Sequence, residues 1–203
     1  MDNSYVSLKY NSKSRWLSYW YQTAETLEVA PSGVLLIGKG GGFTEDALRR
    51  LSGGKTSVFT MDINRSIGPD VAGNVTQLPF ASDSFDVAVC CQVLEHIPFH
   101  EFSTALRELH RVTKRRVIIS LPHKRKHIKL SYKIPFLKER TIIIKNPFTA
   151  GHCSSKQHFW EISRGVSKTE VKSCLGRYFE IEKEFLNEIN CEHRFFVLKR
   201  KKG

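Results

Sequence analysis

Long hydrophobic runs are absent from the sequence, and no stretch approaches the roughly 18 apolar residues that a membrane-spanning helix needs. The first residues are polar and lack the apolar core of a signal peptide. These two absences favour a cytoplasmic protein with no transmembrane segment. With 203 residues, of which 40% are hydrophobic, the chain is long enough to bury a core and fits a single domain over residues 1–203.

Cysteine is scarce, and its spacing predicts neither disulfides nor a metal site. The count is odd, and no pair has the C-x-x-C spacing. The five are Cys90, Cys91, Cys153, Cys174 and Cys191. Such cysteines are typical of reduced thiols in a reducing compartment. One further set, of histidines with a cysteine, has the residue types of a zinc site, but its spacing fits no standard motif, so we predict no metal. That set is His123, His127, His152, Cys153 and His158.

Acidic residues are outnumbered, with 20 acids against 32 lysines and arginines and a net charge of +12. Residues 123–145 hold eight of these cations but only one acid, Glu139. Such a basic segment attracts phosphates, anionic headgroups or acidic glycans, although a solvated surface loop has the same composition. Composition therefore predicts an anionic group on a partner or substrate and leaves the solvated loop open as the alternative.

Short apolar runs alternate with helical patterns along most of the chain. The spacing predicts strands over residues 34–37, 57–61, 85–90, 116–121, 178–185 and 194–199. It predicts helices over residues 14–29, 43–51, 100–112 and 168–175. This alternation favours βαβ units and a parallel sheet covered on both faces, which is a doubly wound α/β fold. The basic segment 122–160 contains Pro135 and Pro147, breaks the alternation and is predicted to be an insertion.

The glycine-rich stretch LLIGKGGG, residues 35–42, follows directly from the first predicted strand. Glycines at such a place let the backbone approach a ligand next to a helix N-terminus. The spacing is G-x-G-x-G, and Phe43 occupies the last glycine position of the dinucleotide pattern, which disfavours a pyrophosphate ligand. Asp62 follows the second strand, where a carboxylate can accept hydrogen bonds from both hydroxyls of a ribose.

Three further segments follow in order: GNVTQLPF at residues 73–80, SFDVAVCCQVLEHI at 84–97 and LRELHRV at 106–112. With the glycine loop and Asp62, this ordered set resembles the class I S-adenosylmethionine-dependent methyltransferases, in particular the type 11 group. The resemblance covers residues 33–121. It implies a Rossmann-like doubly wound sheet, mostly parallel with an antiparallel last strand, with an N-terminal helix before it and an insertion after the fifth strand.

The resemblance also implies how the single domain is divided. Residues 1–32 would form a helical cap and residues 33–121 the cofactor-binding half. Residues 122–160 would form an insertion on the acceptor side, and residues 161–203 the closing helix and strands. S-adenosylmethionine is the implied cofactor.

Nine residues match the family positions that contact this cofactor. Three glycines would line its methionine end, an aspartate would hold the ribose, and an isoleucine would flank the adenine. An asparagine and a valine would meet the adenine edge, and two residues would pass under the sulfonium. In chain order these are Gly38, Gly40, Gly42, Asp62, Ile63, Asn74, Val75, Cys91 and Gln92.

The sequence departs from the family pattern at three positions in or near this set. Leu36 replaces an acid that helps to hold the amino end of the cofactor. Lys39 brings a cation close to a sulfonium, which is unfavourable unless the side chain points away or pairs with the cofactor carboxylate. Asn74 replaces the usual aspartate but keeps an acceptor oxygen.

Methyl transfer from a sulfonium is an in-line displacement that mainly requires alignment of the acceptor and exclusion of water. A base is needed only where the acceptor must lose a proton, as a hydroxyl does. His96 and His123 are the catalytic candidates, because each follows a strand that ends at the cofactor. A purely structural role is equally compatible with His96.

The implied function is transfer of a methyl group to a small-molecule, glycan-linked or lipid-linked acceptor, with oxygen as the favoured atom. Two alternatives stay open. An RNA methyltransferase would use the basic charge, although the chain has neither a recognisable RNA-binding module nor the N/D-P-P-Y tetrapeptide of base methylation. A catalytically degenerate binding or scaffold protein of the same fold would account for Leu36 and Lys39.

Overall fold

The structure, a computed structural model, describes residues 5, 7–123, 127–132, 140–145, 155, 157–189 and 191–201. Every helix and strand predicted from the sequence lies within these ranges and is present, with boundaries that differ by no more than three residues. The division of the domain into four parts stays a prediction. Within the described residues, no helix is both long and apolar enough to cross a membrane.

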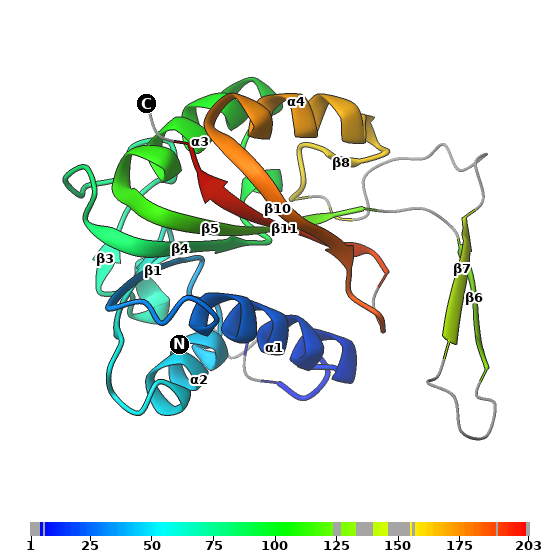
Figure 1. The fold of residues 1–203 in the computed structure, drawn as a ribbon, viewed down its shortest axis with the longest axis horizontal. Coiled ribbons are helices and arrows are strands. Elements are labelled where there is room, and N and C mark those ends of the chain that lie inside the picture. Colours follow the sequence, from blue (N-terminus) through cyan, green and yellow to red (C-terminus); the bar gives the residue numbers. More distant parts are fainter. Residues whose placement is uncertain are drawn as a thin grey trace.

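Seven of the described strands form the central sheet, in the order β10-β11-β5-β4-β1-β2-β3 (Figure 1). They are β1 (Gly33–Ile37), β2 (Ser57–Asp62), β3 (Val71–Ala72), β4 (Phe85–Cys91), β5 (Thr113–Pro122), β10 (Phe179–Leu186) and β11 (His193–Arg200). The first five run parallel, and β11 runs antiparallel to both of its neighbours. This confirms the expected mostly parallel sheet with an antiparallel last strand.

Helices cover both faces of the sheet. They are α1 (Lys13–Leu27), α2 (Phe43–Leu51), α3 (Phe99–Val112) and α4 (Lys168–Tyr178). Figure 1 shows α1 and α2 on one side of the sheet and α3 and α4 on the other. Alternate residues of β1 enter the two cores, with Leu35 in the cluster that includes α3 and α4 and Leu36 in the cluster that includes Leu48 of α2. Because both faces are buried, this strand reads as a continuous apolar run.

The insertion carries its own pair of strands. There β6 (His127–Tyr132) pairs antiparallel with β7 (Arg140–Lys145), and the pair forms a sheet separate from the central one (Figure 1). Four short elements complete the description: η2 (Arg65–Ile67), η3 (Leu94–His96), β8 (Glu161–Ile162) and β9 (Gly165–Val166). The carboxyl ends of β1, β2, β4 and β5 meet at one edge of the sheet, which is where ligands bind in open α/β folds.

Candidate active site

The glycine loop connects β1 to α2 at this carboxyl edge. Gly38, Gly40 and Gly42 have positive φ angles of 82°, 53° and 79°, which would strain any residue with a side chain. Gly38 also lacks room for one, because a Cβ there would lie 2.5 Å from Cγ2 of Val93, just beyond β4. The loop therefore packs directly against the segment that follows a neighbouring strand.

The N-terminal segment reaches the same loop. A Cβ on Gly41 would lie 2.9 Å from the carbonyl oxygen of Tyr5, so the two backbones are in close contact. Asn11 donates from Nδ2 to that carbonyl at 2.7 Å and accepts a hydrogen bond from the Tyr19 hydroxyl of α1 at 3.0 Å. Sequence reasoning did not assign Tyr5 to the site, because no local pattern links it to a loop so far along the chain.

Asp62 ends β2 beside the glycine loop, since Gly38 donates its backbone N–H to the carbonyl of Met61 at 2.8 Å. Oδ1 of Asp62 accepts a hydrogen bond from the Asn64 backbone at 2.9 Å, whereas Oδ2 has no partner among the described residues. Next to this carboxylate, the side chain of Ile63 is 78% exposed. A carboxylate flanked by an exposed aliphatic surface suits a ribose that carries a flat base.

Asn74 and Val75 lie in the loop after β3. The backbone N–H of Gly73 donates to the carbonyl of Asp62 at 3.1 Å and ties this loop to the end of β2. Asn74 is exposed, and its Oδ1 accepts a hydrogen bond from the Thr76 backbone at 3.1 Å. Val75 is buried in the core, so any contact that it makes with an adenine edge would come from its backbone.

Cys91 and Gln92 lie where β4 ends. Gln92 has a φ of 56° and makes two hydrogen bonds to Ser120 of β5, from its backbone to the carbonyl at 2.9 Å and from Nε2 to the hydroxyl at 3.2 Å. A left-handed residue other than glycine costs about 1–2 kcal/mol, and such strain clusters at functional sites. Burial raises the pKa of the Cys91 thiol to about 12, so the thiol offers a neutral surface rather than a nucleophile.

Two departures from the family pattern now have a structural account. The Lys39 ammonium donates to the carbonyl of Gly68 at 2.7 Å and pairs with the Glu45 carboxylate at 3.2 Å. These partners offset the charge that would otherwise repel a sulfonium. Leu36 is 2% exposed and packs with Leu48, so hydrophobic core fills the place of the family's acid.

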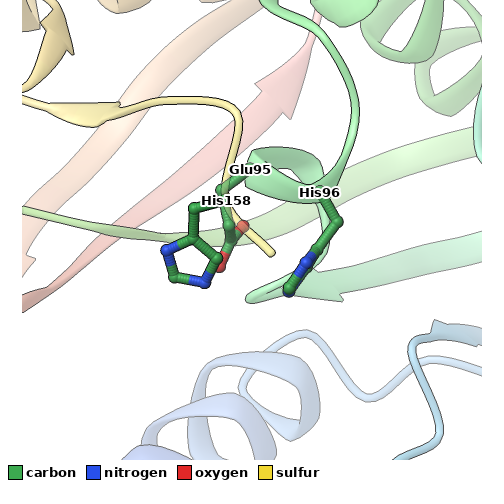
Figure 2. Close-up of side chains that lie close together, drawn as sticks. All are labelled: Glu95, His96 and His158. Atoms are coloured by element: carbon green, nitrogen blue, oxygen red, sulfur yellow. The ribbon is translucent and has the colours of Figure 1, made fainter. Parts of the chain in front are cut away.

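Glu95, His96 and His158 come together beside the end of β4 (Figure 2). Glu95 and His96 belong to η3, and His158 lies in the segment before β8. One nitrogen or oxygen atom from each lies within 4.8 Å of the other two, and the two imidazole rings meet edge to face with centroids 4.9 Å apart. We call this group the Glu95 cluster.

Glu95 is fully buried, and neither of its carboxyl oxygens has a hydrogen-bond partner elsewhere in the described part of the chain. Burial, with a contribution from the nearby Glu161, raises the pKa of Glu95 to about 8. The backbone carbonyl of Glu95 accepts a hydrogen bond from the Phe159 N–H at 2.9 Å, which holds the segment of His158 against η3. A buried carboxyl without a partner costs about 1–3 kcal/mol or more and calls for a functional reason.

Hydrogen bonds define the proton positions on both histidines of the cluster. Nδ1 of His96 lies 3.1 Å from the carbonyl of Gln157, which can only accept, so this nitrogen carries the hydrogen. Nδ1 of His158 lies 2.7 Å from Oε1 of the buried Glu161, and an ionised carboxylate places the hydrogen on the same nitrogen there. Burial, together with the neighbouring His158, lowers the pKa of His96 and favours its neutral form. In each ring Nε2 is therefore the nitrogen that remains for a further partner.

His123, the other catalytic candidate, lies just beyond β5 and is 6% exposed. Its Nδ1 accepts a hydrogen bond from Nε of Arg194 at 2.7 Å, and its Nε2 lies 3.1 Å from the Ser163 hydroxyl. A role as base would require one of these bonds to open. Of the zinc set weighed from the sequence, His152, Cys153 and the side chain of His127 lie outside the described residues.

Comparison with known proteins gives a family match and several structural neighbours. The family model described as "Methyltransferase domain" matches residues 35–121. The N-methyltransferase NodS from Bradyrhizobium japonicum WM9, in complex with S-adenosyl-L-homocysteine, is 14% identical with a TM-score of 0.63, covering 99% of this chain and 100% of that one. Magnesium protoporphyrin IX methyltransferase from Synechocystis PCC 6803 with bound SAH is 15% identical with a TM-score of 0.59, covering 92% and 85%.

A third neighbour binds both an acceptor and a cofactor product. It is the 1,6-didemethyltoxoflavin-N1-methyltransferase from Burkholderia thailandensis, with bound 1,6-didemethyltoxoflavin and S-adenosylhomocysteine. It is 15% identical with a TM-score of 0.60, covering 98% of this chain and 87% of that one. A search of curated proteins finds no match.

At 14–15% identity, the structural neighbours show that the fold is shared and do not establish the acceptor. The family match spans the strands that position Gly38, Asp62 and Gln92 at one edge of the sheet. Residues 35–121 therefore match the methyltransferase domain family, and the chain has the fold of S-adenosylmethionine-dependent methyltransferases.

Proposed function

We propose that this protein transfers the methyl group of S-adenosylmethionine to a small-molecule acceptor, free or linked to a glycan or lipid, with oxygen as the receiving atom. The observation that carries the proposal is Asp62, whose Oδ2 has no partner among the described residues, next to the exposed Ile63 and the glycine loop. In this arrangement the carboxylate holds the ribose, Ile63 supports the adenine and the glycine loop holds the methionine end. That the protein is cytoplasmic stays a prediction.

The choice of oxygen rests on the need for a base. A hydroxyl must lose a proton on methylation, and His96 offers an Nε2 lone pair beside the segment that contacts the glycine loop. His123 stays a second candidate, although both of its ring nitrogens have partners. Two of the neighbours are N-methyltransferases by name, but at such low identity they support a small acceptor more than they favour an atom.

The RNA alternative gains no support from the described basic surface. A hollow lined by cations opens at the amino end of β5 and the carboxyl end of β11, which is the edge of the sheet opposite to the glycine loop. Its cationic lining residues are Lys114, Arg115, Arg116, Lys199, Arg200 and Lys201. The scaffold alternative loses one of its two arguments, because Lys39 already has partners that offset its charge.

The test is calorimetric titration of the purified protein with S-adenosylmethionine and S-adenosylhomocysteine. Asp62→Asn keeps an Oδ1 acceptor for the Asn64 backbone but loses the charge that the ribose hydroxyls recognise. We expect its affinity to fall about 10- to 100-fold, the effect of one or two charge-assisted hydrogen bonds. Asp83→Asn is the matched control, because Asp83 lies in the turn before β4, remote from the glycine loop, and asparagine tolerates its φ of 56°.

Equal binding by wild type and Asp62→Asn would remove the ribose contact from the proposal. Failure of both ligands to bind the wild type would favour the scaffold alternative. A methyl acceptor that is RNA would show itself by a steep loss of binding as salt is raised, which a small acceptor would not reproduce.

A further inference from the structure

The residues proposed to contact the cofactor do not include the Glu95 cluster, so its arrangement needs another explanation. We propose that Glu95, His96 and His158 bind a single divalent transition-metal ion at the acceptor side of the methyltransferase site. The three side chains come from two segments far apart in the sequence and lie side by side in Figure 2.

The burial of Glu95 is the first argument. Its side chain is 0% exposed, and both carboxyl oxygens lack a partner among the described residues. Buried carboxyl oxygens without a partner have lost the hydrogen bonds that water would give them, which is unfavourable for the neutral group and more so for the charged one. No lysine or arginine of the described part of the chain forms an ion pair with it. A divalent cation would give these two oxygens a partner.

The orientation of the two histidines is the second argument. Each has its Nδ1 directed at an oxygen acceptor, the Gln157 carbonyl for His96 and the Glu161 carboxylate for His158. Histidines that bind metals usually donate their other ring N–H to a carbonyl or carboxylate, which fixes the ring and makes the ligating nitrogen more basic. In both rings Nε2 is therefore the nitrogen that remains for a metal.

The ligand set indicates the kind of metal. Two imidazoles and one carboxylate bind Zn²⁺ in catalytic sites and also suit Fe²⁺, Mn²⁺ and Co²⁺, with one or more coordination positions open. Metal–ligand bonds of about 2.0–2.2 Å would bring the ligand atoms to about 3.3–3.5 Å from one another. The three ligand atoms now lie up to 4.8 Å from one another. To bind one ion they would have to approach one another by about 1–1.5 Å, which small side-chain rotations allow.

The position of the cluster suggests its purpose, a step that rests on the proposed function. Val93 touches the glycine loop, and Glu95 follows it by two residues. An acceptor hydroxyl on an open metal position would lose its proton more readily to solvent. The resulting oxyanion would attack the methyl carbon, forming the C–O bond as the C–S bond breaks to leave a methyl ether and S-adenosylhomocysteine. The metal would then take the place of His96 Nε2 as the group that activates the hydroxyl.

The experiment is a titration of chelator-treated protein with Co²⁺, followed by visible absorption and by calorimetry without S-adenosylmethionine. We expect one equivalent to bind, with absorption bands typical of four- or five-coordinate Co²⁺. Zn²⁺ should displace it. Glu95→Gln and His158→Gln should each weaken binding by 10-fold or more, because each removes a ligand while keeping a similar shape.

His100→Gln is the matched control, since the imidazole of His100 is exposed and lies outside the cluster. Glu95→Gln should fold at least as well as the wild type, because it replaces a buried ionisable group with a neutral one, and far-UV circular dichroism checks this. Binding that is equal in all variants would place Co²⁺ elsewhere and overturn the proposal. So would the absence of stoichiometric binding to the wild type.

The metal proposal and the proposed function can fail separately. Asp62→Asn should lose affinity for S-adenosylmethionine and keep its Co²⁺ spectrum. Glu95→Gln should lose the spectrum and keep its affinity for S-adenosylmethionine. If the wild type binds S-adenosylmethionine but no Co²⁺, the cofactor site is supported and the metal site is contradicted.

Discussion

Gly38 and Gly42 have nearly the same backbone conformation but very different surroundings. Their φ angles are 82° and 79°, so a Cβ is equally strained at both positions. At Gly42 a Cβ would meet nothing within 4 Å, whereas at Gly38 it would overlap Cγ2 of Val93. An alanine at Gly42 therefore has only the cost of the strained backbone, whereas an alanine at Gly38 has that cost and the cost of a steric clash as well.

Gly42→Ala should lower the free energy of unfolding by about 1–2 kcal/mol, the cost of a left-handed alanine. Gly38→Ala should cost more and should also weaken S-adenosylmethionine binding, because the loop must move away from Val93. Urea unfolding and calorimetry measure the two effects. In a double-mutant cycle, Val93→Ala should recover part of the loss in Gly38→Ala, and a coupling energy near zero would show that the contact does not matter.

Leu36 and Lys39, two departures from the family motif, each have a defined place in the fold. Lys39 looks like an obstacle in the sequence, but its ammonium contacts the Gly68 carbonyl and the Glu45 carboxylate. Leu36 looks like a missing ligand, but its side chain is part of a packed core. Replacing Leu36 by aspartate would bury a carboxylate there, so a stability loss would mask any gain in cofactor affinity.

At the scale of elements, α4 begins with a complete capping box. The Ser167 hydroxyl accepts a hydrogen bond from the Glu170 backbone at 3.1 Å, and the Glu170 carboxylate accepts one from the Ser167 backbone at 2.9 Å. This pair directly follows β9 and starts the helix that packs on α3. The cap therefore sets where α4 begins after the two short strands that follow His158.

Ser167→Ala should reduce the free energy of unfolding by about 1 kcal/mol, since it leaves a backbone N–H of the first turn without its acceptor. Chemical denaturation measures the change. Ser167→Asp is the control and should retain most of the stability, because aspartate is an equally good N-cap. If alanine and aspartate behave alike, the hydrogen bond to Glu170 contributes nothing measurable.

At the scale of the whole molecule, Arg116 of β5 links the end of α1 to β10. Its guanidinium pairs with Glu28 after α1 at 2.6 Å and with Glu182 of β10 at 2.9 Å, and it donates to the carbonyl of Glu25 at 3.0 Å. Hydrogen bonds from Lys183 and Arg116 lower the pKa of Glu28. A depressed carboxyl pKa adds stability above its ordinary value, and this stability is lost as the pH falls through the lowered value of the folded state.

Arg116→Ala should destabilise the fold by about 1–3 kcal/mol, a range reduced from that of fully buried pairs because Glu28 is partly exposed to solvent. It should also flatten the decline in stability as the pH falls below the ordinary pKa of a glutamate, because Glu28 loses one of its two cationic partners. Thermal unfolding over a pH series measures both. Arg115→Ala is the matched control, since its exposed side chain makes one hydrogen bond to the Val29 carbonyl. An equal effect of the two substitutions would contradict a special role for Arg116.

Much of the fold could be read from the sequence because its signals are local. Apolar runs such as residues 34–37 and 85–90 mark buried parallel strands, and the glycines after the first of them mark the ligand edge. The short strand β3 was missed, because two residues carry no alternating pattern. The cofactor residues were placed by resemblance, and their roles stay predictions for the titration to test.

The sequence by itself determined the order of strands and helices and the residues that follow each strand, since both depend on neighbours along the chain. Only the tertiary structure decided which of those residues meet. His96 and Gln157 stand 61 positions apart, and no periodicity predicts that the later segment returns to η3. The same holds for Tyr5 over the glycine loop and for Arg194 on His123. Contacts of this kind depend on how the packed faces of the sheet direct the connecting loops, and that is a property of the folded molecule as a whole.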